Sequence, residues 1–497
     1  MDKGKRASGI LLPIFSLPSP YGIGTFGKQA YDFVDQLKNA KQQYWQILPL
    51  CPTSFGDSPY QSFSTFAGNP YFIDLEVLIK EGLLTKEECD AVDFGDDCST
   101  IDYAKLYTGR YPLLKKAFIR SKHQQLPEYS DFKKLNTGWL GDYCLYMAVK
   151  NHFHNKSWLE WDDDIKFRHP SAVKRYTKEL AQEIEFHSFL QYAFALQWNK
   201  LKKYSNDKGV KIFGDIPIYV AMDSADVWAN PDLFLLDEDL MPQKVAGVPP
   251  DYFSAEGQLW GNPLYRWERH AQDGYAWWIE RIDYALRLLY DTVRIDHFRG
   301  FDAFWAIPYG EKNAVKGQWC KGPGMDLFKQ IKKVLGDVDI IAEDLGLQTE
   351  SLHALLQETG YPGMKVIQFG FHNEEDSDHL PHNYCKNQVV YTGTHDNTTL
   401  LQWYRELAEV DKEFTDRYCR VAGEKPNFDM IASVFQSVAD LVIIPLQDYL
   451  EKDGEARINT PSTIGSNWLW RLAKGEFDAS VQEQIALLTQ TYFRCLT

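Results

Sequence analysis

Short apolar runs recur along the chain, each rich in Ile, Val or aromatic residues and each bounded by Gly, Pro or a polar turn. A near-continuous apolar run of this length is typical of a strand that is buried on both faces of a parallel sheet. Eight such runs are present, at residues 10–15, 44–50, 211–220, 292–298, 339–345, 364–371, 389–396 and 441–446. Stretches with apolar residues at helical spacing separate several of them, at residues 30–40, 279–289, 325–335 and 350–358. Eight strand–helix units predict an α/β fold of the (β/α)8 TIM barrel type.

The spacing of these runs is uneven. About 160 residues separate the second run from the third, and much of that stretch has the helical pattern, as at 141–153 and 178–201. We therefore expect a mainly helical insertion at approximately residues 52–205, packed beside the barrel mouth. A second insertion is expected at approximately residues 221–275. Because the candidate strands reach both ends of the chain, residues 1–497 are interpreted as a single barrel domain with insertions, and separate domains are the alternative.

The composition of the chain limits the kinds of molecule that the protein is expected to bind. The formal net charge of −16 argues against binding to nucleic acid or to an anionic membrane, since both attract basic surfaces. No apolar run approaches the ~18 residues that a membrane helix needs, and the N-terminal residues lack the pattern of a secretion signal. Eight scattered cysteines without CxxC spacing indicate reduced thiols rather than a disulfide framework or a zinc site. These features predict a cytoplasmic protein without a metal centre.

Aromatic residues make up 14% of the chain, including 15 Trp and 28 Tyr. Two readings fit this content. The rings either fill a large core, or they line a cleft in which flat rings stack on the faces of sugars.

Three acidic residues each end one of the apolar runs: Asp296 in TVRIDHF, Glu343 in DIIAEDLG and Asp396 in VVYTGTHDN. A carboxylate at the tip of a buried strand is costly to desolvate. If the strands are parallel, the tips of the fourth, fifth and seventh strands open on one rim, where barrels place their chemistry. Two close carboxyls with different proton affinities are the equipment for breaking a glycosidic bond.

The neighbours of each acid indicate its chemistry. Strand alternation puts Arg294 on the same face as Asp296, so the guanidinium is expected to lower the pKa of Asp296 and keep it ionised as a nucleophile. A mainly apolar segment precedes Glu343, and desolvation there would raise its pKa, as suits a general acid. His395 and Asp396 could both hydrogen-bond sugar hydroxyls. Each acid also has a structural alternative: an Arg–Asp pair at a strand end, a paired strand-end Glu, and an Asx turn, respectively.

Four of these stretches, GDIPIYV, TVRIDHFRG, IAEDLG and GTHDN, resemble the signature regions of the α-amylase-like glycosidase clan. Three longer stretches are more specific: RASGILLPIFSLPSPYGIGTFG, FGDSPYQSFSTFAGNP and VAGVPPDYFSAEGQLWGNPLYRW. They are similar to the 4-α-glucanotransferases called amylomaltases or disproportionating enzymes, glycoside hydrolase family 77. The resemblance runs from about residue 7 to the C-terminus.

The resemblance implies a catalytic role for each of the three acids. Asp296 would be the nucleophile that forms a covalent β-glycosyl–enzyme intermediate. Glu343 would protonate the departing oxygen and then activate the incoming sugar hydroxyl. Asp396 would bind ring hydroxyls and help to distort the donor sugar.

The same resemblance implies a set of substrate-binding and supporting residues. They are Tyr60, Asp215, Asp251, Gln258, Trp260, Arg294 and His395. Tyr60 would stack on the donor sugar, Asp215 would brace the floor of the site, and Arg294 would support the nucleophile. Asp251, Gln258 and Trp260 lie on the loop that arches over the cleft in this family.

The implied activity is retaining transfer of an α-1,4-glucan segment from a maltodextrin donor to the 4-hydroxyl of glucose or of another α-1,4-glucan. Maltooligosaccharides, starch and glycogen all fit as donors, and the resemblance implies no metal or cofactor. One alternative is an α-1,4-glucan hydrolase of the same clan, which would differ in how well the acceptor site excludes water. Pro249, Pro250 and Trp260 make the arching loop apolar, which favours transfer. A non-catalytic glucan-binding protein is the other alternative, and the presence of all three acids argues against it.

Overall fold

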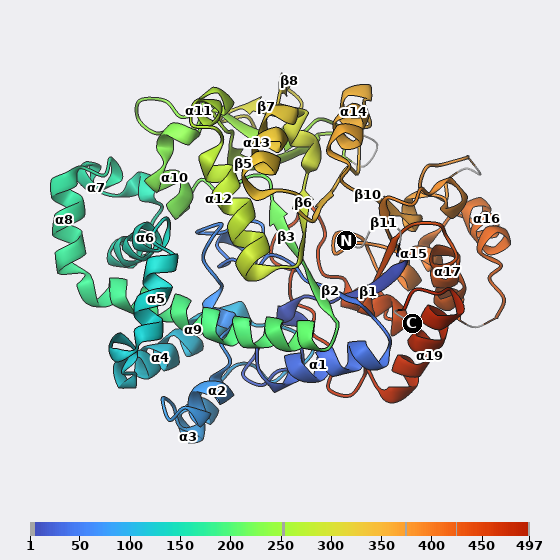
Figure 1. The fold of residues 1–497 in the computed structure, drawn as a ribbon, viewed down its shortest axis with the longest axis horizontal. Helices are drawn as coiled ribbons and strands as arrows, with labels where there is room; N and C mark the ends of the chain where they lie inside the picture. Colours follow the sequence, from blue (N-terminus) through green and yellow to red (C-terminus); the bar gives the residue numbers. More distant parts are fainter. Residues whose placement is uncertain (1–4, 251–253, 373–374, 424, 496–497) are drawn as a thin grey trace.

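The computed structural model describes residues 5–250, 254–372, 375–423 and 425–495, and its centre is a sheet of eight parallel strands (Figure 1). The strands are β1 (Ala7–Leu11), β2 (Tyr44–Gln46), β3 (Lys211–Pro217), β6 (Thr292–Asp296), β9 (Ile340–Ala342), β10 (Gly363–Val366), β11 (Gln388–Tyr391) and β12 (Leu441–Pro445). Their order in the sheet is β10-β11-β12-β1-β2-β3-β6-β9. The two ends of this order meet, since the backbone N–H of Ala342 donates to the carbonyl of Pro362 at 2.9 Å. The sheet is therefore a closed barrel, and the predicted (β/α)8 fold is confirmed.

Alternating side chains of each strand enter two separate cores. In β12, Leu441 and Ile443 join a cluster inside the barrel, whereas Val442 and Ile444 join the larger core between the barrel and its helices. Seven of the eight strands contribute apolar side chains to the interior cluster. The exception is β6, whose corresponding positions are Thr292, Arg294 and Asp296. Polar side chains of the site therefore already lie inside the barrel, on β6.

All eight predicted strand runs overlap a barrel strand, but the first lies earlier than expected. The run at 10–15 was expected to be the strand, whereas β1 ends at Leu11 and a 3-10 turn follows at Ile14–Ser16. Pro13 explains the difference, because proline has no N–H to donate to a neighbouring strand.

The helices around the barrel correspond closely to the predicted helical stretches. They are α1 (Lys28–Asn39), α12 (Ala276–Tyr284), α13 (Met325–Leu335) and α14 (Glu350–Thr359). A π-helical turn, Ala285–Leu289, continues α12 up to the start of β6. The remaining helices outside the β2–β3 connection are α10 (Ala225–Ala229), α11 (Trp267–Gln272), α15 (Leu400–Glu406), α16 (Glu409–Cys419), α17 (Pro426–Phe435), α18 (Leu446–Tyr449) and α19 (Ala479–Thr491).

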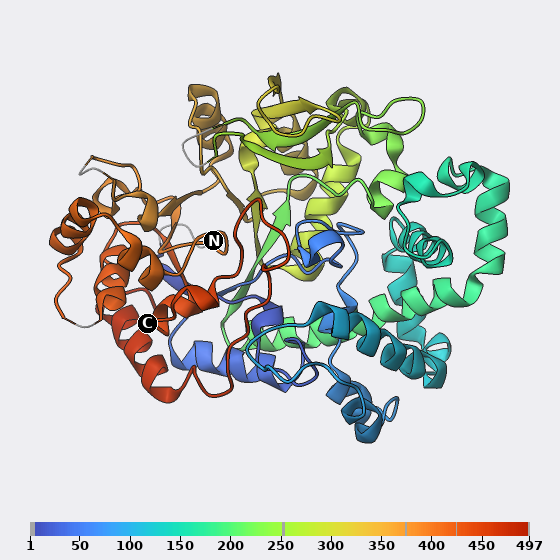
Figure 2. The ribbon, with the colours of Figure 1, turned by 180° about the vertical axis from the view of Figure 1, so that it is seen from behind.

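A helical lobe is built from the long connection between β2 and β3, and it stands at the side of the barrel (Figures 1 and 2). Its helices are α2 (Leu75–Lys80), α3 (Lys86–Asp90), α4 (Tyr103–Arg120), α5 (Pro127–Leu135), α6 (Leu140–His152), α7 (Asp163–Lys166), α8 (Pro170–Glu179) and α9 (Ala181–Asp207). The last of these, α9, runs from the lobe to the barrel. There the Trp198 indole N–H donates to the carbonyl of Leu289 at 3.1 Å, and Lys202 donates to the carbonyl of Tyr290 at 3.0 Å.

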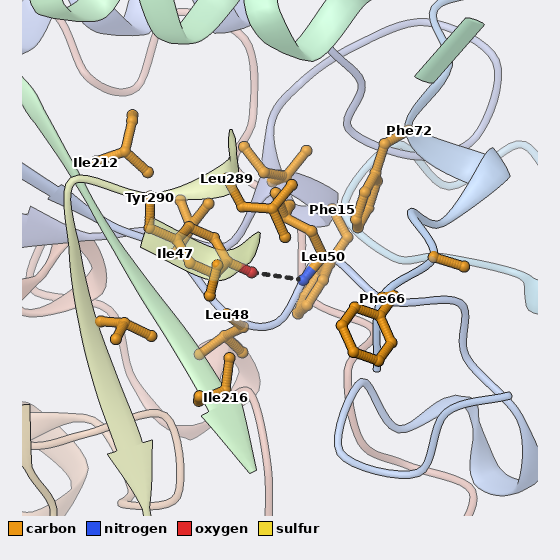
Figure 3. Packing of buried hydrophobic residues seen from close by; sticks show 14 of the residues in the cluster. Phe15, Ile47, Leu48, Leu50, Phe66, Phe72, Ile212, Ile216, Leu289 and Tyr290 are labelled. Atoms are coloured by element: carbon orange, nitrogen blue, oxygen red, sulfur yellow. Dashed lines mark hydrogen bonds between the residues drawn. The ribbon is translucent and has the colours of Figure 1, made fainter. Parts of the chain in front are cut away.

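Apolar side chains from the barrel and from the start of the lobe connection share one core (Figure 3). Tyr290 lies at its centre, and its hydroxyl accepts a hydrogen bond from the backbone N–H of Leu50 at 3.3 Å. The ring of Tyr290 also lies directly over Gly214 of β3. A Cβ atom at residue 214 would be only 2.1 Å from the Tyr290 ring, so only glycine fits there.

A second sheet of four antiparallel strands lies above the barrel, at the top of Figure 1. It consists of β4 (Lys244–Val248), β5 (Gln258–Pro263), β7 (Ala303–Pro308) and β8 (Gln318–Lys321), in the order β5-β4-β7-β8. The first two strands come from the connection after β3 and the other two from the connection after β6. The sequence predicted an insertion at 221–275 but did not predict which strands it pairs with. In the structure, it pairs with strands from residues 303–321.

No helix within the described residues is long and apolar enough to cross a membrane. All eight cysteines lie within the described ranges, and all have free thiols.

Replacement of Gly214 by alanine is expected to lower the free energy of unfolding by about 1–3 kcal/mol, because the added methyl group would overlap the Tyr290 ring. Urea unfolding followed by tryptophan fluorescence measures this change. Gly141→Ala is the matched control, since Gly141 lies in α6 with no atom near the position of an added Cβ. That substitution should leave stability unchanged or raise it by up to about 1 kcal/mol. Equal stability of the two variants would contradict the packing described for Tyr290.

Candidate active site

The three acids that end apolar runs lie at the same end of the barrel. Asp296 is the last residue of β6, Glu343 directly follows β9, and Asp396 lies in the connection that follows β11. Because these strands are parallel, their carboxyl ends share one rim. The charges of Glu343 and Asp396 both act on the pKa of Asp296, as expected for groups grouped around one site.

Arg294 links the barrel interior to this rim. One of its guanidinium nitrogens donates to Asp215 Oδ2 at 2.6 Å and the other to Asp296 Oδ1 at 2.8 Å. The register explains the contact, because Asp215 of β3 lies directly opposite Arg294 of β6. The side chain of Asp215 is 0% exposed and that of Arg294 is 4% exposed, whereas that of Asp296 is 28% exposed. Asp215 is thus sealed beneath the site, and Asp296 faces the open end.

Tyr60 contacts Asp215 through its hydroxyl, and His395 and Trp468 through its ring. Its hydroxyl donates to Asp215 Oδ2 at 2.7 Å. Its ring stacks on that of His395, with the ring centres 5.1 Å apart and the planes 12° apart. Trp468 lies against both rings, at 5.8 Å from Tyr60 and 6.0 Å from His395.

The net pKa of Asp296 differs from the sequence-based expectation. Arg294 does lower it, as expected, but burial outweighs this effect, and the charges of Asp215, Glu343 and Asp396 add to the rise. The pKa of Asp296 is therefore raised, and the expectation of a low value was wrong. Three carboxyls, those of Asp215, Asp296 and Glu343, interact with the one guanidinium of Arg294, so a single positive charge cannot keep them all ionised at no cost. Asp296 and Glu343 interact and therefore titrate as a pair.

Glu343 is held by the backbone. Its Oε2 accepts a hydrogen bond from the N–H of His297 at 2.8 Å, and its Oε1 accepts one from the N–H of Leu345 at 2.7 Å. Burial raises the pKa of Glu343, while Arg294 and these two N–H groups oppose the rise. The neighbouring Asp344 turns the other way, and its Oδ1 accepts from the N–H of Met364 in β10 at 2.7 Å. Of the two adjacent acids, Glu343 therefore belongs to the site and Asp344 to the barrel wall.

Asp396 is held in place by residues near the C-terminus. Asn459 donates to Asp396 Oδ1 at 2.6 Å, and Arg457 donates to the Asp396 carbonyl at 2.8 Å. Nε2 of His395 lies 3.3 Å from the same Oδ1, and burial lowers the pKa of His395, so its ring is neutral near pH 7. The side chain of Asp396 remains 40% exposed and faces solvent. Asn459, Arg457 and Trp468 were not predicted from the sequence, although they lie in a Gly-, Pro- and Trp-containing stretch, RINTPSTIGSNWLW, typical of a binding loop.

The second sheet brings two further predicted residues close to His297, the residue after Asp296. Trp260 of β5 packs edge-to-face against the ring of His297, with ring centres 4.8 Å apart, and lies 6.3 Å from Tyr219. Its indole N–H donates to Gln258 Oε1 at 3.1 Å. Asp251, the third residue predicted on this arching loop, lies outside the described residues, as do Tyr252 and Phe253.

The rim therefore combines three carboxyls in different surroundings, and glycosidic bond cleavage needs a pair of carboxyls with different roles. It has a carboxyl bound to a guanidinium, a second carboxyl oriented by backbone amides, and a third, partly exposed carboxyl beside a neutral histidine. Aromatic rings from the second sheet and from Tyr60 border this group of polar side chains.

Comparison with known proteins agrees with this chemistry. Residues 12–476 match the glycoside hydrolase family 77 model, described as 4-alpha-glucanotransferase. The 4-alpha-glucanotransferase of Streptococcus pneumoniae is 50% identical over 99% of this chain and 98% of its own length. That of Clostridium butyricum is 48% identical over 97% of this chain and 99% of its own length.

Among solved structures, the amylomaltase from Streptococcus agalactiae in complex with acarbose superposes with a TM-score of 0.96 at 43% identity. The match covers 99% of this chain and 100% of that one. Sequence and structure thus agree over essentially the whole length, and the chain belongs to the 4-alpha-glucanotransferases of glycoside hydrolase family 77.

Proposed function

We propose that this enzyme cuts an α-1,4 bond of a maltodextrin, holds the released glucan on Asp296, and passes it to the 4-hydroxyl of glucose or of another α-1,4-glucan. The observation that carries this proposal is the pair of acids at neighbouring strand ends. One, Asp296, is bound to a guanidinium, and the other, Glu343, is bound to two backbone amides. This pairing suits a double displacement through a covalent intermediate.

In the first step, Asp296 attacks C1 of the donor sugar while the bond from C1 to the departing oxygen breaks. Arg294 occupies Oδ1, and among the described residues Oδ2 of Asp296 has no hydrogen-bond partner, so Oδ2 is the attacking atom. Glu343 gives its proton to the departing oxygen. Burial raises the pKa of Glu343, which supports the presence of that proton near neutral pH.

In the second step, the Glu343 carboxylate takes the proton from the 4-hydroxyl of the acceptor. The acceptor oxygen then bonds to C1, and Asp296 leaves as a carboxylate. Arg294 stabilises the negative charge that returns to Asp296. The product keeps the α configuration because C1 is inverted twice.

Asp396 and His395 would bind hydroxyls of the donor ring. The partial exposure of Asp396 and its anchoring by Asn459 support this role, since a fixed carboxylate binds hydroxyls with less loss of entropy. Tyr60 would provide a flat face for the same sugar, and its bond to Asp215 limits rotation of the ring.

Transfer rather than hydrolysis requires that water be kept from the covalent intermediate. The second sheet, which carries Trp260 and Gln258, supports this function because it packs against His297, the residue next to Asp296. Asp251 would belong to the same cover. Maltooligosaccharides, starch and glycogen would all serve as donors, since each contains α-1,4-linked chains.

We also propose that the whole chain acts as one catalytic barrel, with a mainly helical insertion at about 52–205 and a flap-bearing insertion at about 221–275. The course of α9 supports this, because one helix contributes to both the lobe and the barrel packing. The eight free thiols support a cytoplasmic location, where thiols stay reduced.

Incubation with pure maltotriose is expected to yield glucose together with a ladder of longer oligomers, since the glucan on the enzyme passes to another maltotriose. Anion-exchange chromatography of the products measures this. Glucose and maltose without any lengthened product would instead identify a hydrolase.

Asp296→Asn is expected to lower transfer by about 10⁴-fold or more, because an amide cannot form the covalent ester. Calorimetry should still detect maltodextrin binding to this variant. Asp131→Asn, at an exposed position on α5, is the matched control and should keep full activity. Activity of the Asp296 variant above a few per cent of the parent would refute the assignment of the nucleophile.

Arg294→Gln is expected to move both limbs of the pH profile of kcat/KM to higher pH. The reason is that Arg294 lowers the pKa of both Asp296 and Glu343, so its loss raises both values. Arg294→Lys keeps the positive charge and should shift the limbs less. Thermal unfolding checks that the variants remain folded, since Asp215 would lose its buried partner. Limbs that stay in place or move to lower pH would contradict the electrostatic role of Arg294.

A further inference from the structure

His297, the residue after Asp296, has an unusual backbone conformation. Its φ and ψ are 52° and 47°, in the left-handed region that few non-glycine residues adopt. In this conformation its N–H donates to Glu343 Oε2 at 2.8 Å. The N–H of Leu345 holds the other oxygen at 2.7 Å, so both oxygens of the carboxyl are fixed by the backbone. The orientation of Glu343 therefore depends on the conformation of a residue at the end of the neighbouring strand.

The side chain of His297 is enclosed between the barrel rim and the second sheet. Trp260 of β5 meets its ring edge-to-face at 4.8 Å, and Tyr219 lies at 6.4 Å. On the rim side, a Cβ added to Gly300 would lie 3.3 Å from the His297 ring. The ring is therefore held on both sides.

His297 is not suited to move a proton itself. Its Nε2 is buried and has no hydrogen-bond partner among the described residues. Burial, helped by the charge of Arg299, lowers the pKa of His297 to about 3, so the ring stays neutral at the pH at which Glu343 would act. The packing of the ring and the conformation of its backbone are therefore the features through which His297 can affect proton transfer by Glu343.

We propose that His297 is a positioning residue, through which the second sheet holds Glu343 in the orientation for proton transfer. The Trp260 contact keeps the His297 ring in place, the ring keeps the backbone left-handed, and the backbone N–H fixes the carboxyl. The inference rests on the proposed role of Glu343 as proton donor. Under this proposal, the orientation of Glu343 depends on the second sheet, and Glu343 is correctly oriented when that sheet lies over the site.

The charged groups around Glu343 define what the loss of this contact would do. Arg294 lowers its pKa, Asp344 raises it, and Asp296 titrates together with it. The N–H groups of His297 and Leu345 stabilise the ionised form. If the His297 N–H turned away, the pKa of Glu343 would rise and its proton would no longer point in one direction.

Two donor substrates distinguish a loss of proton transfer from effects on binding or on the nucleophile. Maltotriose has a sugar hydroxyl as leaving group and needs a proton, whereas α-maltotriosyl fluoride releases fluoride with little proton assistance. His297→Ala removes the ring and disfavours the left-handed backbone. It should slow transfer from maltotriose on the order of 30-fold, a part of the full effect of general acid catalysis. Release of fluoride in the first turnover, which reports the first step alone, should stay within about threefold of the parent, whereas the second step needs Glu343 as base with either donor.

Glu343→Gln tests the underlying role separately. In the first step it should show the same selective loss for maltotriose, and a larger one. If Glu343→Gln slowed the first step equally with both donors, the proposed role of Glu343 as proton donor would fail. If Glu343→Gln were selective in that step but His297→Ala slowed it equally with both donors, the inference about His297 would be overturned, because His297 would then act on binding or on the nucleophile.

Substitutions of His297 by asparagine and of Trp260 keep the test valid even if the alanine variant does not fold, and a double variant tests the coupling. His297→Asn should recover transfer from maltotriose to within about fivefold of the parent, because asparagine tolerates the left-handed region. Trp260→Leu should slow the first step with maltotriose more than with the fluoride, and both Trp260→Leu and His297→Ala should move the alkaline limb of the pH profile upward. Trp260→Phe should show a smaller selective loss. In the double variant of His297→Ala and Trp260→Leu the losses should not multiply, since both act through one contact. Independent, fully multiplicative losses would overturn the coupling.

Discussion

The buried bridge from Asp215 through Arg294 to Asp296 is the interaction on which the site depends. Seven barrel strands fill the interior with apolar side chains, while β6 places Thr292, Arg294 and Asp296 there. A guanidinium in such an interior is tolerable only with close acceptors, and Asp215 and Asp296 supply them at 2.6 and 2.8 Å. The bridge thus satisfies the barrel interior and at the same time fixes one oxygen of the reacting carboxyl.

Burial has a second consequence for the chemistry. Low exposure raises the pKa of both Asp296 and Glu343, while Arg294 opposes the rise for each. A retaining mechanism needs one carboxyl ionised and one protonated at the same pH. Two interacting acids that share one nearby guanidinium meet this need as a pair. Their fixed partners differ, a guanidinium for Asp296 and two backbone amides for Glu343, so each carboxyl is oriented by a different part of the structure.

The residues around the pair come from connections that are distant along the chain. Asp396 is anchored by Asn459 and Arg457, and Tyr60 from the β2–β3 connection stacks on His395. The second sheet joins the connection after β3 to the connection after β6, the strand that ends at Asp296. A barrel makes this possible, because its strand ends form one rim on which separate loops meet.

Most of the barrel was predictable from the sequence, since a strand buried on both faces must be apolar at nearly every position. Asp296, Glu343 and Asp396 were also predictable, because each is a carboxylate at the end of an apolar run. Since parallel strands end on one rim, the three acids could be expected to lie together. The pattern of apolar and polar residues did not predict the net pKa of Asp296, the pairing of β4 with β7, or the contacts of Asn459 and His297. Each depends on burial or on an approach between segments far apart in the chain, and a local pattern of apolar and polar residues carries no information about either. The sequence by itself therefore determined the barrel and its three acids, and the tertiary structure decided how those acids are charged, oriented and covered.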